Sequence, residues 1–267
     1  MANARMPEEF FDILAHHLPP KQPVGPRGGR PRVGHRCVVR VIWFVLATGA
    51  RWEDVPAELG CSGRTAHRRL RAWEEAGVWG RLHADLLRLL KRAGKLDTDT
   101  AIIDGVTLRA FGGDATGPSP VDRRRSGTKH TLMVDPSGVP LAIRTAGANA
   151  SDHRQILPLV VKFPEVGGTP GRPKQLPDDV YADRGYDSEE TRAFLRWLGI
   201  EPHIARRGTP HGSGLGKVRW VVERTIAWIK GLRRMRVRYD RLGVMIDAWT
   251  TLTASVICFR IMHHDVM

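Results

Sequence analysis

Three acidic residues occupy positions that suit metal-dependent chemistry on phosphates. Asp104 lies in or at the end of an apolar strand pattern, TAIIDGVTL, and Asp183 directly follows a second strand pattern, VYA. A carboxylate at the end of a central strand is held rigidly and points into the crevice where α/β sheets bind ligands. Glu223, in a nearby predicted helix, would supply a third carboxylate. We take these three residues as candidate catalytic groups.

Carboxylates that converge on one point repel one another and raise each other's pKa values unless cations lie between them. Oxygen ligands without Cys or His suit Mg²⁺, with Mn²⁺ as an alternative. Two such ions, roughly 3.5–4 Å apart, can activate an attacking oxygen and stabilise a leaving one in phosphoryl transfer. The pattern thus predicts metal-binding roles for Asp104, Asp183 and Glu223. Taken singly, an aspartate is more often a loop or cap residue, and we interpret the following ones so: Asp97, Asp99, Asp114, Asp135, Asp152, Asp178 and Asp179.

Residues 217–239 would position Glu223. The stretch contains no proline and a single glycine, Gly231, so it predicts one continuous helix. An advance of about 100° per residue collects an apolar stripe on one side: Val218, Val222, Ile226 and Ile229. On another side it places one carboxylate among cations: Arg219, Glu223, Lys230 and Arg234. Such a ridge suits a polyanion if a divalent cation reverses the local charge. The alternative is an ordinary amphipathic helix with an Arg219–Glu223 salt bridge.

The charge of the chain points to a polyanionic partner. Its 267 residues carry a formal net charge of +14, with a pI near 10.6, which favours nucleic acid. The three cysteines, Cys37, Cys61 and Cys258, form no ligand cluster, so neither a disulfide framework nor a zinc site is expected. The N-terminus lacks a signal-peptide pattern, and the most apolar run, residues 248–259, is too short to span a bilayer. We expect a cytoplasmic protein without a membrane partner.

The chain divides into three predicted parts. Residues 1–36 predict a basic arm, because they end in a stretch rich in Pro, Gly and Arg, although they open with a short amphipathic piece around Phe10, Phe11, Ile13 and Leu14. Residues 37–96 are helical: a buried helix at 38–46, a short helix at 52–59, a turn, and a helix capped by Ser62. The outer face of that last helix carries Arg64, His67, Arg68 and Arg71. This layout is typical of a helix-turn-helix, and the alternative is a small helical bundle with a solvated basic surface.

Residues 97–267 show alternating strand and helix patterns. Strands are expected at 100–108, 130–135, 139–145, 180–182 and near 203–205, and the last helix at 244–262. Between the first two strands, residues 112–128 predict a flexible basic loop that carries Arg123, Arg124 and Arg125. Asp152 is expected to cap a helix after the hairpin. This order predicts a mixed sheet with helices on both faces.

Several of these blocks, in this order, resemble a known protein family. The matching blocks are IDGVTLRA, RSGTKHTLMVDPSGVPLAIRTAGANASDHRQ, YADRGYDS and RWVVERTIAWIKGLRRMRVRYDR. They resemble the bacterial DDE transposases of the fifth insertion-sequence family. The segment RWEDVPAELGCSGRTAHRRLRAWEEAGVWGRL is similar to the N-terminal DNA-binding segment of that family. The resemblance runs from about residue 36 to residue 262.

The resemblance implies an α/β fold in which a helix-turn-helix domain precedes a ribonuclease H-like catalytic domain. The metal-binding triad of the family maps onto Asp104, Asp183 and Glu223. Only 39 residues separate the last two, which leaves no room for a large β-insertion. A signature of the wider superfamily is Tyr, two residues, Arg, three residues, Glu, six residues, Lys. Arg219, Glu223 and Lys230 match that spacing, but Gly216 stands where the Tyr would be.

The function that the resemblance implies is DNA transposition. The protein would bind the terminal inverted repeats of its insertion sequence, cleave there with two Mg²⁺ ions, and join the 3′-hydroxyl ends to target DNA as a homodimer, at the bacterial nucleoid. The expected DNA-binding residues are Arg64, His67, Arg68, Arg71, Arg123, Arg124, Arg125, Lys129, Arg219, Lys230, Arg233 and Arg234. Three alternatives stay open: a helix-turn-helix repressor, a ribonuclease H-like nuclease that cuts without joining, and an inactive or domesticated relic that acts as a DNA-binding regulator.

Overall fold

The N-terminal part of the predicted arm belongs to the hydrophobic core. The computed structural model describes residues 5–20, 28, 31–169, 172–208 and 216–263. Helix α1 (Glu8–Ala15) buries Phe10 and Leu14. The ring of Phe10 lies 5.1 Å from that of Trp43 and 5.4 Å from that of Phe259. The prediction of an arm over residues 1–36 is therefore wrong for α1, because its apolar face packs against the core. Most of the basic stretch, residues 21–27 and 29–30, lies outside the described residues.

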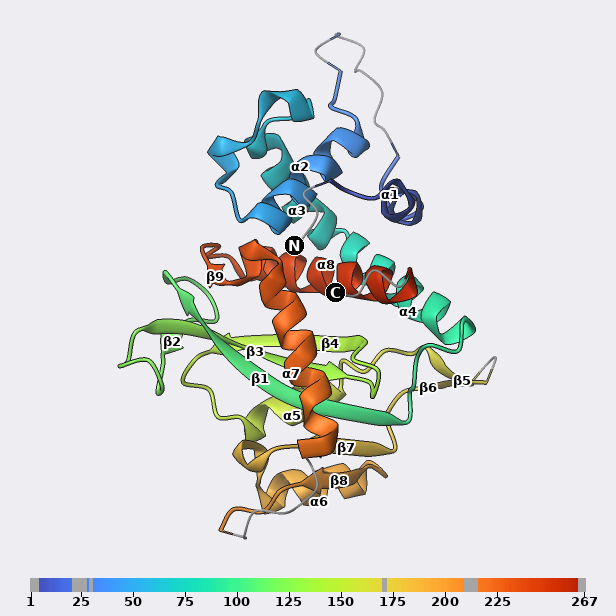
Figure 1. Ribbon diagram of the computed structural model, residues 1–267, viewed down its shortest axis with the longest axis vertical. Coiled ribbons are helices and arrows are strands. Elements are labelled where there is room, and N and C mark those ends of the chain that lie inside the picture. Colours follow the sequence, from blue (N-terminus) through green and yellow to red (C-terminus); the bar gives the residue numbers. More distant parts are fainter. Residues whose placement is uncertain (1–4, 21–27, 29–30, 170–171, 209–215, 264–267) are drawn as a thin grey trace.

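Three further helices form the upper layer of Figure 1: α2 (His35–Thr48), α3 (Gly63–Glu75) and α4 (Val78–Arg92). Between α2 and α3, two 3₁₀ turns replace the short helix predicted from the sequence: η1 (Trp52–Asp54) and η2 (Ala57–Leu59). Pro56 explains the difference, because it lacks a backbone N–H and disfavours helical backbone at Val55. The predicted cap of α3 is confirmed, since Ser62 Oγ accepts the Thr65 N–H at 3.3 Å.

The lower layer is a mixed sheet with the spatial order β4-β3-β1-β7-β8. Its strands are β1 (Thr100–Ala110), β3 (Ser126–Val134), β4 (Pro140–Gly147), β7 (Asp179–Ala182) and β8 (Glu201–Ile204). The pairs β4–β3 and β3–β1 are antiparallel, whereas β1–β7 and β7–β8 are parallel. This is the strand order of a ribonuclease H-like sheet. The predicted fold class, including its mixed sheet, is confirmed.

The remaining strands are short. They are β2 (Gly117–Pro118), β9 (Val237–Arg238), and a separate two-stranded hairpin of β5 (Gly167–Thr169) and β6 (Arg172–Lys174). In the described chain between Asp183 and α7 lie only η3 (Arg184–Tyr186), α6 (Glu189–Trp197) and β8. A large β-insertion is therefore absent from the described residues there.

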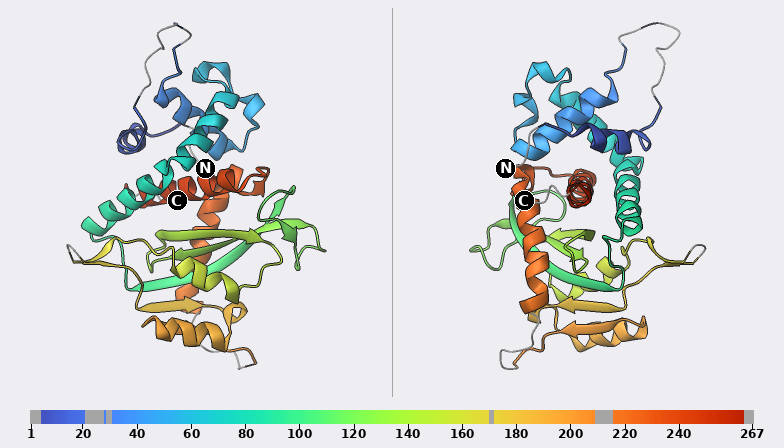
Figure 2. Two further views of the ribbon diagram at one scale, coloured as in Figure 1. Left: turned by 180° about the vertical axis from the view of Figure 1, so that it is seen from behind. Right: turned by 45° about the vertical axis from the view of Figure 1, so that its right-hand side comes forward.

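Helices cover both faces of the sheet, as Figure 2 shows. Helix α7 (Gly216–Gly231) packs across β1 and β3 on one face, and α5 (His153–Val160) packs against β3 and β4 on the other. Val222 and Ile229 are buried as predicted. The predicted continuation of this helix to residue 239 is wrong. The chain turns at Gly231 into η4 (Arg233–Met235), because Leu232 and Met235 are drawn into the core. Arg236 Nε then donates to the Lys230 carbonyl at 2.8 Å, near the end of the helix.

The two layers meet on α8 (Gly243–Met262), which lies between them in Figure 1. This helix packs against α3 and α4 on one side and against β4 on the other. Its length and apolar composition would suffice to cross a membrane, but most of its side chains are buried inside the protein. The ring of Trp249 stacks on that of Trp52 from η1, 5.7 Å away. Helix α8 is thus a core helix that both layers share.

Candidate active site and nucleic-acid interface

The sheet opens beside the middle of β1, and two of the predicted acids lie at this opening. Strand β7 pairs with β1 at residues 100–102, and β9 pairs with it again only at Arg109 and Ala110. Asp104 lies in the interval between them, and Asp183 directly follows β7. Each acid uses one oxygen locally: Asp104 Oδ1 accepts the Gly105 N–H at 2.7 Å, and Asp183 Oδ1 accepts the Gly185 N–H at 2.8 Å. The other oxygen of each carboxylate is left to face α7.

Helix α7 brings Arg219 and Glu223 to the same place. Arg219 Nη2 lies 3.2 Å from Asp104 Oδ2, 3.7 Å from Asp183 Oδ2 and 3.5 Å from Glu223 Oε1. The three predicted acids therefore do converge, and they converge on a guanidinium. Burial by itself would lower the pKa of Arg219, but these three carboxylates raise it. Burial raises the pKa of Asp104, and the Gly105 N–H and Arg219 oppose that rise.

The donor set fits a divalent cation, although the described residues contain no ready-made group of three acidic, His or Cys side chains around a metal position. The guanidinium of Arg219 occupies the space between the three carboxylates. Its positive charge takes the place that a divalent cation would take. The surrounding atoms are carboxylate oxygens, which are the ligands that Mg²⁺ and Mn²⁺ prefer. Divalent cations would fit here if Arg219 withdrew.

Sequence reasoning missed one acid that lies next to this site. Asp152 stands at the start of α5, but its side chain makes no capping hydrogen bond. Instead, Asp152 Oδ1 lies 2.6 Å from Lys129 Nζ. The two residues are 23 positions apart, and they meet only because α5 packs on β3. No local pattern in the sequence could have found this pair.

Comparison with known proteins decides the family. A family model described as "Transposase DDE domain" matches residues 95–257, which include all three converging acids. The chain belongs to this transposase family. A second model, described as "Putative transposase of IS4/5 family", matches residues 6–83 of the transposase. The family resemblance drawn from the sequence blocks is thereby confirmed.

The transposase is similar to proteins of one insertion element. It is 50% identical over 155 residues to a putative transposase for insertion sequence element IS402 of Burkholderia cepacia, covering 58% of this chain and 74% of that protein. It is 43% identical over 123 residues to an uncharacterized 16.2 kDa protein of IS402, covering 45% of this chain and 84% of that protein.

Solved structures of Mos1 complexes are more distant. The Mos1 strand transfer complex gives a TM-score of 0.36 at 13% identity, over 88% of this chain and 77% of that chain. The Mos1 mariner paired end complex with Mn gives 0.33 at 15% identity, over 96% and 84%. The fold assignment therefore rests on the strand order.

The predicted recognition helix α3 presents part of its basic set to solvent. Arg64 and Arg68 are exposed, and Arg68 lines a groove together with Arg32 and Arg69. His67 is half-buried, with its ring 5.4 Å from that of Trp52, and Arg71 Nε donates to Glu75 at 2.8 Å. Of the four predicted contacts, Arg64 and Arg68 are therefore the best placed for DNA.

The basic segment between β2 and β3 is a tight turn, whereas the sequence predicted a flexible loop. The Arg124 N–H donates to the Ser119 carbonyl at 3.0 Å, and the Ser119 N–H donates to the Arg125 carbonyl at 2.8 Å. Arg123 and Arg124 have φ values of 45° and 59°, which are uncommon for residues other than glycine. Such strained backbone often marks functional positions. The turn holds all three predicted arginines exposed. Lys230 and Arg233 are exposed as well.

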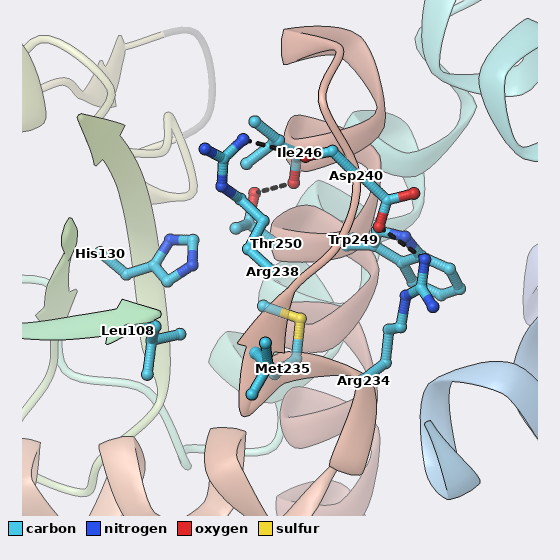
Figure 3. Close-up of a pocket in the computed structure, with 10 residues that line it drawn as sticks. Leu108, His130, Arg234, Met235, Arg238, Asp240, Ile246, Trp249 and Thr250 are labelled. Atoms are coloured by element: carbon cyan, nitrogen blue, oxygen red, sulfur yellow. Dashed lines mark hydrogen bonds and ion pairs between the residues drawn. The ribbon is translucent and has the colours of Figure 1, made fainter. Parts of the chain in front are cut away.

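Two predicted DNA contacts are buried. Arg234 is only 7% exposed, and its Nη2 lies 2.8 Å from Asp240 Oδ2, as Figure 3 shows. Lys129 is 9% exposed and pairs with Asp152. To reach DNA, Arg234 would have to break a buried ion pair, which is costly, and Lys129 would have to leave both its buried position and its ion pair with Asp152. We therefore remove both residues from the candidate DNA-binding set.

Proposed function

We propose that this transposase binds the terminal inverted repeats of its own insertion sequence, cleaves there by metal-dependent hydrolysis, and joins the 3′-hydroxyl ends to target DNA. The observation that carries the proposal is the convergence of Asp104, Asp183 and Glu223 on one point at the opening of the sheet. These residues come from β1, from the end of β7 and from α7. Three carboxylates gathered in this way have a chemical use when divalent cations lie among them.

Asp104, Asp183 and Glu223 would hold the ions, either Mg²⁺ or Mn²⁺, which supply water activation and leaving-group stabilisation in phosphodiester cleavage. The strand positions keep Asp104 and Asp183 rigid, so the ligands are arranged before DNA arrives. Arg219, once released from the carboxylates, is close enough to bind a phosphate beside the scissile bond. Lys230 and Arg233 extend this cationic surface along the end of α7 and the start of η4.

We assign DNA recognition to residues 37–96 and catalysis to residues 97–267. Arg64 and Arg68 on α3 would contact the terminal repeat, and the arginine turn at residues 123–125 would contact DNA nearer the sheet. The net charge of +14 supports an extensive phosphate contact. Joining needs two element ends held together, so the proposed working form is a homodimer on DNA at the nucleoid.

The test uses the DNA that flanks the gene, as a labelled substrate for the purified protein. Wild type should bind this DNA, nick it in Mg²⁺ and join the ends to a target plasmid. Glu223→Gln should bind equally well but neither cleave nor join, because one carboxylate of the cluster is lost. Glu190→Gln, on the exposed first turn of α6, is the matched control and should behave as wild type.

The outcomes separate the alternatives. Full cleavage by Glu223→Gln in Mg²⁺ would refute the proposed site. Binding without any cleavage by wild type would favour the DNA-binding relic or repressor. Cleavage without joined product would favour a nuclease.

A further inference from the structure

The ion pair of the buried Lys129 and the half-buried Asp152 lies on the far side of the sheet from Arg219. In the β1–β3 ladder, Gly105 pairs with Thr131 and Thr107 with Lys129, whereas Asp104 pairs with Leu132. Because successive residues of a strand point to opposite faces, Lys129 and Asp104 face opposite sides. Asp104 meets α7, and Lys129 meets the start of α5.

Lys129 holds one oxygen of Asp152. Lys129 Nζ donates to the Ala150 carbonyl at 2.7 Å and to Asp152 Oδ1 at 2.6 Å. A carboxylate at the first position of a helix would ordinarily accept backbone N–H groups, but Asp152 makes no such bond. The side chain of Asp152 therefore does not act as a helix cap, and its contacts lie with Lys129 and the turn at Gly185.

The second oxygen of Asp152 faces the turn that carries Asp183. A Cβ atom added at Gly185 would lie 3.0 Å from Asp183 Oδ1 and 3.1 Å from Asp152 Oδ2. The two carboxylates therefore both border the space that the missing Gly185 side chain leaves open. Helix α5 also packs against η3, so this arrangement is part of a larger contact.

Asp183 thus lies between opposite charges. On the α5 side stands Asp152, whose charge repels it, and on the α7 side stands Arg219, 3.7 Å from Asp183 Oδ2, whose charge attracts it. Both influences turn Asp183 Oδ2 in the same direction, toward Asp104 and Glu223. Lys129 compensates the charge of Asp152, because its Nζ lies 2.6 Å from Asp152 Oδ1.

We propose that Asp152, anchored by Lys129, is a positioning residue that orients Asp183 toward the other two acids. This inference rests on the proposed function, because it assigns Asp152 a role through a metal-binding Asp183. Residues that orient metal ligands commonly change metal affinity by 10- to 100-fold when they are replaced. Asp152 acts here through charge and through the space that Gly185 leaves open.

The test compares single and double replacements by near-isosteric neutral residues. Lys129→Met leaves Asp152 without its cation and should lower the melting temperature. The double variant Lys129→Met/Asp152→Asn removes both charges and should recover most of the melting temperature measured in EDTA. Its affinity for Mn²⁺, measured by calorimetry on the DNA-free protein, should nevertheless be about 10-fold weaker than that of wild type.

Two further variants sharpen the comparison. Gly185→Ala inserts a methyl group between the two carboxylates and should weaken Mn²⁺ binding by a similar factor while the fold is retained. The double variant Arg234→Met/Asp240→Asn removes a buried pair elsewhere, which joins η4 to the segment between β9 and α8, and should leave Mn²⁺ affinity unchanged.

The outcomes distinguish this inference from the proposed function. If wild type binds Mn²⁺, Asp183→Asn does not, and Lys129→Met/Asp152→Asn binds as wild type does, then the pair is only structural and the positioning role is refuted. If Asp183→Asn binds Mn²⁺ as tightly as wild type, the proposed metal site itself is wrong.

Discussion

Arg219 Nη2 lies 3.2 Å from Asp104 Oδ2, although the two residues are 115 positions apart in the chain. The same nitrogen also faces Asp183 and Glu223. Each acid of the site is therefore compensated by a cation that the protein itself supplies. Divalent cations at this place would compete with Arg219, and that competition can be measured.

Replacing Arg219 by Gln removes the shared cation and leaves three carboxylates in mutual repulsion. In EDTA the variant should be less stable than wild type by about 2 kcal/mol, below the 3–5 kcal/mol of a fully buried pair because the site is partly exposed. Added Mg²⁺ should raise the melting temperature of the variant more than that of wild type, since no guanidinium competes. Arg196→Gln, in a surface pair with Glu201, is the control. A smaller Mg²⁺ effect in Arg219→Gln would contradict this account.

Arg64 and Arg68 should each contribute one phosphate or base-edge contact. Replacing either by Ala should weaken binding to the flanking repeat and, if the contact is to phosphate, reduce the slope of log Kd against log salt by about 1. Arg71→Ala should have a smaller effect, because Arg71 is engaged with Glu75. Fluorescence anisotropy over a salt series measures both quantities. Arg88→Ala, in an exposed pair with Asp85 on α4, serves as control, and equal slopes for all variants would argue against α3 as the recognition helix.

Replacing glycine by alanine should have opposite effects on stability at Gly63 and at Gly80. A Cβ at Gly63 would lie 1.8 Å from the Trp52 carbonyl oxygen, whereas a Cβ at Gly80 in α4 would meet no atom within 4 Å. Gly63→Ala should therefore destabilise the fold by about 1–3 kcal/mol or more, because α3 and η1 must move apart. Gly80→Ala should stabilise it by about 0.5–1 kcal/mol, since Ala is the better helix former. Urea unfolding of both variants gives the sign, and a destabilised Gly80→Ala would refute the argument.

Glu74 should make stability depend on pH. Burial on α3, with a smaller contribution from nearby Asp247, raises its pKa to about 7, compared with about 4.3 in an unfolded chain. Between these values the folded protein keeps a proton that the unfolded chain releases, so stability falls as pH rises through this window. Glu74→Gln should therefore raise the melting temperature at pH 8 and flatten its decline between pH 5 and pH 8. An equal gain at both pH values would show that charge is not the cause.

The three acids could be identified from the sequence, but the residue that lies among them could not. Asp104 and Asp183 stood out because strand ends beside apolar runs are visible locally, Glu223 stood out as a carboxylate among cations on a predicted helix, and the resemblance supported all three. The spacing of Arg219 and Glu223 predicted their mutual salt bridge, but Arg219 also reaches β1, and no helical period encodes that contact. Lys129 was predicted to contact DNA. Its burial could not be foreseen, because it depends on the packing of α5 against β3.

Helix ends were predicted least well where tertiary contacts override local preference. The helix over 217–239 was too long because burial of Leu232 and Met235 bends the chain after Gly231. The prediction of a short helix over residues 52–59 was wrong because Pro56 interrupts it, and this signal was present in the sequence. The amphipathic piece around Phe10 and Leu14 was recognised, but it was grouped with the basic arm, whereas it forms α1 and packs on the core.

The position of α8 in the core sets an order on synthesis. Residues 243–262 leave the ribosome after the helices that they support, so α3 and α4 emerge long before their apolar surfaces are covered. Helix α3 therefore receives its final support only when the acids of β1, β7 and α7 have already been made. In a nascent chain, the helical layer is completed only after every residue of the acidic cluster has been synthesised.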